Sequence, residues 1–352
     1  MRPAYNEAMS KRICFLDDSV EYDGFSPTSR PLDGPQKAVA YLAASLAQRG
    51  HAVTVVTRAG IPLTCDGVAY PGLEGERPET CDLLVAVGDP TQFDLVKNAA
   101  TRALWVQGAP ASLDTPNWQG VWQRLSPHLV FHTDAQRDHA NLHGMAAHVI
   151  APAAAPSYVE DMVEPAASPP VAVTVCHPQN GLADLIDLWT EHVHPQAMDA
   201  ELHVYSSLLD RAALSGLVSA DLLAIHEKVQ AAGSQGVCVK RPQPDPQMAS
   251  VYRRARAFLH PGTVGETVAL ALLEAQAGGL PAVSFATGHA AQMRIIDGRT
   301  GFVARDVEAY AAGVVRLLAG EEPHRTMAAD CREWQRGRTW AIAAAEWEER
   351  FL

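Results

Sequence analysis

The sequence predicts an α/β protein with two domains, each built around a parallel sheet. Three observations support this fold class. The chain has 352 residues, which is enough for about two domains that each bury a core. Short apolar strands alternate with helical segments in both halves, as parallel sheets require. The Pro-rich stretch Glu164–Pro170 separates the halves and is the best linker candidate.

The first half begins with a strand, a polar loop, a helix and a second strand. The expected helix, Pro35–Gln48, places Ala38, Leu42 and Leu46 on one face, as a helix that covers a sheet does. Gly50 and His51 close it, directly before an apolar run. The strands expected in this half are residues 12–16, 52–57, 83–87, 103–106 and 129–132.

The second half repeats this alternation. Its expected strands are residues 171–176, 201–205, 236–240, 257–260 and 280–285. Its expected helices are residues 181–191, 248–254, 267–277, 307–318 and 321–336. A last helix is expected at residues 339–352.

Composition narrows the possible partners. The net charge is −12 and no long basic run occurs, so a general nucleic-acid binder is excluded and at most peripheral membrane contact is expected. No apolar stretch is long enough to span a bilayer. Residues 1–10 lack the apolar segment of a signal peptide. We therefore expect a cytoplasmic protein without a nucleic-acid partner.

The most informative stretch is residues 260–283, where Glu266 and Glu274 are separated by seven residues. A strand ends at His260, residues 261–265 read as a loop, and residues 267–277 read as a helix that ends at Gly278. The N-terminus of a helix exposes backbone N–H groups that attract anions. These groups make the helix start a candidate phosphate site, and its candidate residues are Thr267, Val268 and Ala269.

The two glutamates allow two interpretations. Glu274 lies two turns into an otherwise apolar helix, where a carboxylate needs hydrogen-bond donors, and a ribose diol would be one such donor. The alternative is that Glu266 is a helix-terminal carboxylate favoured by the helix dipole and that Glu274 is simply exposed to solvent.

This pattern resembles the E-x7-E signature of retaining glycosyltransferases with the GT-B fold, above all glycosyltransferase family 4, the glycosyl transferases group 1. The resemblance covers about residues 11–340 and is strongest over residues 236–316. It implies two Rossmann-like domains with parallel sheets that face each other across a cleft. The acceptor domain would span residues 11–165 and the sugar-nucleotide donor domain residues 170–338, with residues 339–352 packing back on the first domain.

The resemblance also implies an activity: hexosyl transfer of the EC 2.4 class, with retention, from a nucleoside-diphosphate sugar to an unidentified glycan, lipid, protein or small-molecule acceptor. Glu266 would hold sugar hydroxyls, Glu274 the ribose, and backbone N–H groups near Gly34 part of the diphosphate. No cofactor is expected. The sequence has no Asp-x-Asp motif, so we expect no protein-bound metal.

The sequence departs from the family pattern at positions that matter for chemistry. Asn180 stands where a Lys or Arg usually neutralises the leaving diphosphate, with His177 as the nearby titratable group and Arg241 as a candidate substitute. Gln107 stands where the family has a first-domain histidine, so Glu266 and Gln107 are the candidate catalytic residues. These departures keep open an alternative: a catalytically impaired GT-B protein that binds a sugar nucleotide or a partner without transfer.

Overall fold

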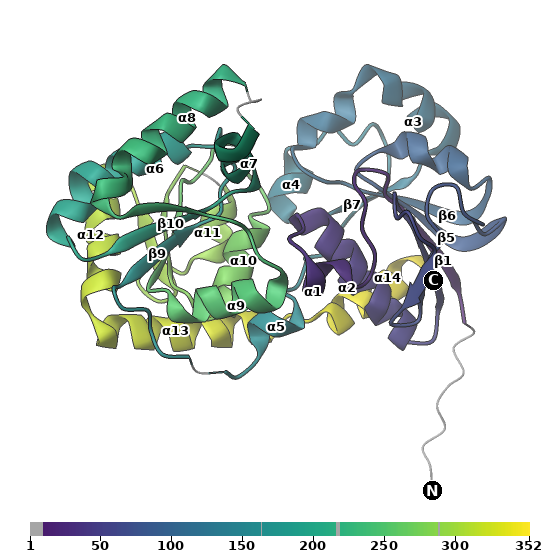
Figure 1. Cartoon of the computed structure of the whole chain (residues 1–352). Coiled ribbons are helices and arrows are strands. Elements are labelled where there is room, and N and C mark those ends of the chain that lie inside the picture. Colours follow the sequence, from purple (N-terminus) through teal and green to yellow (C-terminus); the bar gives the residue numbers. More distant parts are fainter. Residues whose placement is uncertain (1–9, 163, 216–218, 288) are drawn as a thin grey trace, which may run out of the picture. The chain divides into compact units, whose positions relative to one another are not determined.

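The computed structural model describes residues 10–352 apart from residues 163, 216–218 and 288. Nearly all of the N-terminal segment behind the signal-peptide expectation therefore lies outside the described residues. The described chain divides into two compact units (Figure 1). The first contains residues 10–153 together with Thr339–Leu352, and the second contains Ala154–Arg338.

The first unit is built on a sheet with eight strands in its described residues, in the order β3-β4-β2-β1-β5-β6-β7-β8. Neighbouring strands are parallel except at one edge, where β3 and β4 pair antiparallel. The sheet is parallel as predicted apart from this hairpin, where a two-residue turn reverses the chain. The strands are β1 (Arg12–Leu16), β2 (Ala52–Val56), β3 (Leu63–Cys65), β4 (Val68–Tyr70), β5 (Thr80–Val87), β6 (Asn98–Trp105), β7 (His128–Phe131) and β8 (Ala147–Val149).

Helices from both ends of the chain complete the core of this unit. Helix α2 (Gly34–Gln48) has a proline in its first turn and buries an apolar face that includes Leu42 and Leu46. Helix α14 (Trp340–Phe351) packs against α2, and Trp347 lies against Trp105 with the ring centroids 5.4 Å apart. The other helices of this unit are α1 (Ser26–Ser29), α3 (Gln119–Leu125) and α4 (Asp134–Asp138).

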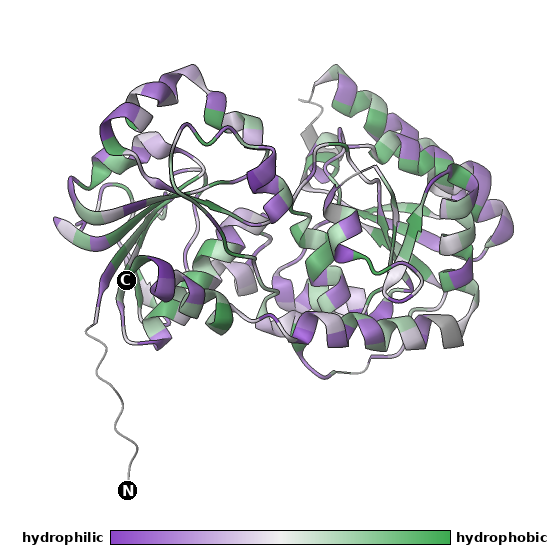
Figure 2. Ribbon diagram, turned by 180° about the vertical axis from the view of Figure 1, so that it is seen from behind, coloured by the Kyte–Doolittle hydropathy of each residue, from purple (hydrophilic) through white to green (hydrophobic). Residues whose placement is uncertain are grey.

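The second unit is built on a sheet with six strands among its described residues, in the order β11-β10-β9-β12-β13-β14. All of these neighbouring pairs are parallel. Figure 2 shows that hydrophobic residues gather in the strands, whereas hydrophilic residues mark the outer helices. The strands are β9 (Val171–Thr174), β10 (Glu201–Tyr205), β11 (Val237–Lys240), β12 (Ala257–His260), β13 (Ala282–Phe285) and β14 (Gly301–Ala304).

The second unit contains two helices that were not predicted, α7 (Ser207–Ser215) and α8 (Ala220–Ala231). Helix α6 continues into a π-helical turn, η4 (Trp189–Val193), so the single helix expected over residues 181–191 is interrupted. The helices are α5 (Pro156–Val159), α6 (Leu182–Leu188), α7 (Ser207–Ser215), α8 (Ala220–Ala231), α9 (Asp245–Arg254), α10 (Leu270–Ala277), α11 (His289–Arg294), α12 (Val307–Ala319) and α13 (Glu321–Arg336).

The strand order places a topological switch point in each sheet. In the second sheet the chain runs from β9 outward to β10 and β11, and then returns to the other side of β9 to build β12, β13 and β14. In the first sheet the same reversal lies between β1 and β5. Open parallel sheets bind ligands beyond the carboxyl ends of the strands at such points. The loops after β9 and β12 are therefore the first place to look for a site.

Candidate functional site

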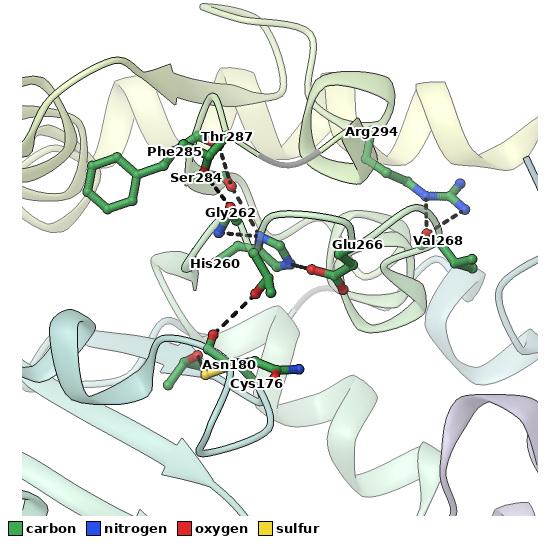
Figure 3. Close-up of polar contacts among 12 residues, drawn as sticks. Cys176, Asn180, His260, Gly262, Glu266, Val268, Ser284, Phe285, Thr287 and Arg294 are labelled. Atoms are coloured by element: carbon green, nitrogen blue, oxygen red, sulfur yellow. Dashed lines mark hydrogen bonds and ion pairs between the residues drawn. The ribbon is translucent and has the colours of Figure 1, made fainter. Parts of the chain in front are cut away.

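The loops after β9 and β12 lie against each other at the switch point of the second sheet. The hydroxyl of Thr263 donates to the backbone carbonyl of Asn180 at 3.1 Å (Figure 3). A Cβ placed on Gly181 would lie 2.9 Å from the Cβ of Pro261, so the two loops touch closely there. The structure thus brings the predicted loop around Asn180 to the loop that carries Glu266.

Glu266 is held by a histidine that was not among the predicted site residues. Its Oε2 atom lies 3.1 Å from Nε2 of His260, the last residue of β12. The His260 side chain is 7% exposed and that of Glu266 is 33% exposed. The sequence contains one indication that His260 could belong to a site, because it is a polar residue at the end of an apolar strand. The pairing with Glu266 depends on the fold of the intervening loop.

Helix α10 begins at Leu270, three residues later than predicted. Ala269 adopts a left-handed conformation, with φ 44° and ψ 63°, and this conformation interrupts a helix that would otherwise start at Thr267. Thr267 and Val268 therefore lie in the loop, not in the first turn. A left-handed residue followed by a helical one turns successive N–H groups toward one side and forms an anion-binding concavity. The predicted donors at Thr267 and Val268 are displaced by this geometry toward Ala269, Leu270 and Ala271.

A cation that the sequence analysis missed supports this loop. The Nε and Nη2 atoms of Arg294 lie 3.3 and 3.2 Å from the Val268 carbonyl oxygen (Figure 3). Among the described residues no carboxylate lies within ion-pair distance of this guanidinium. Burial lowers the pKa of Arg294 to about 10. Because the C=O and N–H of a peptide point in opposite directions, this contact fixes the direction of the Ala269 N–H.

Glu274 is half-buried on α10 and faces a group of tyrosines. Burial raises the pKa of Tyr158 and Tyr252, and the negative charge of Glu274 raises both further. The hydroxyl of Tyr158 donates to Asp245 at 2.9 Å. Glu274 therefore lies near the tyrosines of α5 and α9, which is not the fully exposed surface position of the alternative interpretation.

The residues considered for the place of the usual diphosphate-binding cation lie after two different strands of the second sheet. His177 and Asn180 are exposed in the loop after β9, and His177 Nδ1 accepts from the Gln179 N–H at 3.3 Å. Arg241 follows β11, which is the edge strand of the sheet, and its Nε atom lies 3.9 Å from Asp210. Its side chain is 77% exposed. The fold thus keeps His177 and Asn180 at the switch point, whereas β10 separates the strand before Arg241 from β9.

In the first unit, Gln107 belongs to a buried polar cluster at the carboxyl ends of β6 and β7. Its Oε1 atom lies 3.0 Å from Nε2 of His132, which is 1% exposed and packs on Trp105. The Nε2 atom of Gln107 is buried and has no acceptor among the described residues. Gly34, the other predicted residue of this unit, is the first residue of α2. His132 was not predicted, because its contact with Gln107 joins residues from different strands.

The described residues lack two features that would suggest other functions. No group of three or more His, Cys, Asp or Glu side chains in this part of the chain is arranged to hold a metal ion. Within the same residues, no helix combines the length and apolar character needed to cross a membrane.

Comparison with known proteins agrees with this geometry. Residues 170–320 match the family described as Glycosyl transferases group 1. No curated protein sequence matches the chain. The matched residues include both switch-point loops, the two glutamates and Arg294.

Several solved structures resemble the whole chain. Sucrose-phosphate synthase from Thermosynechococcus elongatus is 15% identical, with a TM-score of 0.71 over 97% of this chain and 98% of that chain. WaaG, a glycosyltransferase of lipopolysaccharide biosynthesis, is 13% identical, with a TM-score of 0.65 over 96% of this chain and 99% of that chain. Anabaena HepE, solved with UDP and glucose, is 13% identical, with a TM-score of 0.65 over 97% and 99% of the two chains. The predicted GT-B fold is confirmed.

Proposed function

We propose that the protein is a family 4 glycosyltransferase of the EC 2.4 class that moves a hexosyl group from a nucleoside-diphosphate sugar to an acceptor with retention. The observation that carries this proposal is the junction of Glu266 with the start of α10 at the switch point of the second sheet. A carboxylate that can hold sugar hydroxyls stands there beside backbone groups that can hold phosphates. These groups match the two parts of a sugar nucleotide on either side of the bond that breaks.

The start of α10 would hold the diphosphate. The N–H groups of Ala269, Leu270 and Ala271 form the concavity, and the helix dipole adds about half a positive charge. Negative charge grows on the diphosphate as the sugar departs, so donors that are already in place stabilise the transition state. Arg294 would contribute by holding the Val268 carbonyl and by placing a positive charge behind this peptide.

Glu274 would bind the ribose and Glu266 the sugar. A half-buried carboxylate is stabilised by hydrogen-bond donors, and a ribose diol offers two. The HepE structure contains UDP and glucose, a nucleotide and a sugar of the kind proposed here. We therefore place uridine nucleotides first among the donors to be tried.

The first unit would bind the acceptor. Gln107 offers a buried N–H that has no acceptor among the described residues, and a sugar or acceptor hydroxyl could receive it. The N–H groups near Gly34, at the start of α2, would add to phosphate binding. No side chain is required as a nucleophile, because the leaving phosphate can take the acceptor proton on the same face of the sugar, which gives retention.

The alternative function is binding of a sugar nucleotide or a partner without transfer. It is favoured by the absence of a permanent cation in the described loop after β9, where His177 and Asn180 stand. Arg241 is exposed beyond the edge strand and has Asp210 as its neighbour. In this alternative the N–H groups at α10 are sufficient to bind a diphosphate but do not stabilise its departure.

One experiment separates these functions. Calorimetry would measure the binding of UDP, GDP and ADP and of their hexose conjugates, and release of the nucleoside diphosphate would then be followed for every donor that binds. We expect turnover by the wild type and a roughly tenfold or greater loss of donor affinity in Glu274→Ala. Glu308→Ala, an exposed glutamate of α12, is the matched control.

The outcomes are distinct. Binding without release, even with candidate acceptors, would favour the binding protein. Wild-type affinity in Glu274→Ala would refute the ribose assignment. No binding of any nucleotide would refute the glycosyltransferase and the sugar-nucleotide binding protein, and only binding of a partner would remain.

A further inference from the structure

His260 lies directly behind Glu266 and has no role in the chemistry proposed above. It ends β12, its ring stacks on Phe258 with centroids 6.5 Å apart, and the whole residue is 6% exposed. The hydroxyl of Tyr310 donates to the His260 carbonyl at 3.1 Å. Both the ring and the backbone of this histidine are therefore fixed by the core of the second unit.

The hydrogen bonds of the ring determine which nitrogen carries the proton. The backbone N–H of Gly262 lies 3.1 Å from Nδ1, and an N–H group can only donate (Figure 3). Nδ1 must therefore be an acceptor, and in the neutral ring the proton is on Nε2. Ser284 Oγ lies 3.1 Å from Nδ1 and 3.2 Å from the Phe285 carbonyl oxygen, and its single proton can be donated to only one of them. Nε2–H then donates to Glu266 across 3.1 Å.

The amide that sets this tautomer is itself held in place. Gly262 has φ 67°, and a Cβ at this position would lie 2.6 Å from the carbonyl oxygen of Phe285. The Thr287 hydroxyl donates to the Gly262 carbonyl. A continuous set of contacts therefore runs from the end of β13 through Gly262 and His260 to the carboxylate of Glu266.

Glu266 would otherwise be free to turn. It lies in the loop before α10, and its side chain is 33% exposed. With Oε2 engaged by His260, the carboxylate keeps one orientation and leaves Oε1 for a ligand. Such preorganisation lowers the entropic cost of binding hydroxyl groups.

We propose that His260 is a positioning residue that orients Glu266 toward the sugar, so that the protein distinguishes a sugar nucleotide from the free nucleoside diphosphate. This inference rests on the proposed function, because it takes Glu266 as the residue that binds the sugar. It assigns His260 no contact with the substrate.

Two variants separate the two hydrogen bonds of the ring. His260→Asn keeps an acceptor for the Gly262 N–H but is too short to reach Glu266. His260→Gln can place an N–H near the position of Nε2. The matched control is His203→Phe, because His203 Nε2 lies 2.7 Å from Glu201 in β10 of the same sheet.

The measurement is the ratio of two affinities by calorimetry: UDP-glucose against UDP, GDP-mannose against GDP, and ADP-glucose against ADP. We expect His260→Asn to reduce the preference for the sugar nucleotide about tenfold and His260→Gln to restore it to within about threefold. His203→Phe should leave the ratio unchanged. In a Glu266→Gln background, His260→Asn should have no further effect, because the two residues act as one unit.

A purely structural role would weaken both ligands equally, and that result would overturn the inference, as would additive effects in the double variant. A wild type that binds both ligands equally would overturn it too. Failure of the wild type to bind any of the nucleotides would instead refute the proposed function, and this inference with it. If His260→Asn does not fold, nitrogen NMR of the wild type decides: a proton on Nδ1 would overturn the proposal.

Discussion

Acid should destabilise the second unit through His324, a partly buried residue of α13. Burial and, to a lesser extent, the charge of Arg256 together lower the pKa of His324 from 6.5 to about 4, although a hydrogen bond to the Ala255 backbone opposes the shift. The folded state therefore binds this proton less readily than the unfolded chain. The contribution of His324 to the free energy of unfolding is fully present above pH 6.5. It is lost as the pH falls toward about 4, where the histidine is protonated in both the folded and the unfolded state.

The magnitude follows from the same shift. A lowering from 6.5 to about 4 corresponds to at most about 3 kcal/mol of unfolding free energy. Solvent contact of the ring screens part of this, so we expect about 1–2 kcal/mol. His324→Gln should remove this contribution, and urea unfolding between pH 7.5 and pH 4.5 would measure it.

The difference between wild type and variant is the informative quantity, because carboxylates titrate in both. His192→Gln, in η4 of the same unit, is the control and should keep the wild-type slope. If His324→Gln loses as much stability on acidification as the wild type, the assignment of this pH dependence to His324 is wrong.

Two further predictions concern the loop that carries Glu266. Gly262→Ala should destabilise the second unit by about 2–3 kcal/mol, because the added Cβ would lie 2.6 Å from the Phe285 carbonyl oxygen and the backbone φ is 67°. Thermal melting would test this, and an unchanged melting temperature would refute it. Arg294→Met should weaken nucleoside-diphosphate binding about tenfold because it releases the Val268 carbonyl, and Arg294→Lys should cause a smaller loss. Calorimetry at two salt concentrations would measure both affinities. Wild-type affinity in Arg294→Met would contradict the role of this cation.

The fold of the second unit was largely predictable because its strands are continuous apolar runs. Residues 257–260 were predicted as a strand and form β12. The start of α10 was missed because alanine is the strongest helix former, and nothing in the sequence marks Ala269 as left-handed. In the folded chain, the carbonyl that precedes Ala269 is held by Arg294, a contact that a local sequence pattern does not contain.

The hairpin of the first unit was missed although it has a local signal. Asp66 and Gly67 both have positive φ, 49° and 79°, and the Asp-Gly pair favours the two-residue turn that joins β3 to β4. The strands on either side have only three residues each, too short for an alternating pattern to be visible.

The candidate site residues also differ in whether the sequence could indicate them. Glu266 and Glu274 could be proposed from the sequence because their spacing within one strand–loop–helix unit is local information. His260, His132 and Arg294 were not, because each acquires its meaning from a partner that only the folded chain supplies. Sequence therefore indicates residues with a local motif sooner than residues whose partners come from other parts of the fold.

The packing of α14 in the first unit has a consequence for biosynthesis. Trp340, Trp347 and Phe351 belong to the same core as Phe15 and Val55, so this core draws on both ends of the described chain. The second unit lies wholly between these contributions. On the ribosome, the unit translated second can finish folding while the unit translated first still lacks the aromatic residues of its core. The order of completion is thus opposite to the order of synthesis, and the nascent first unit would be the part that chaperones recognise.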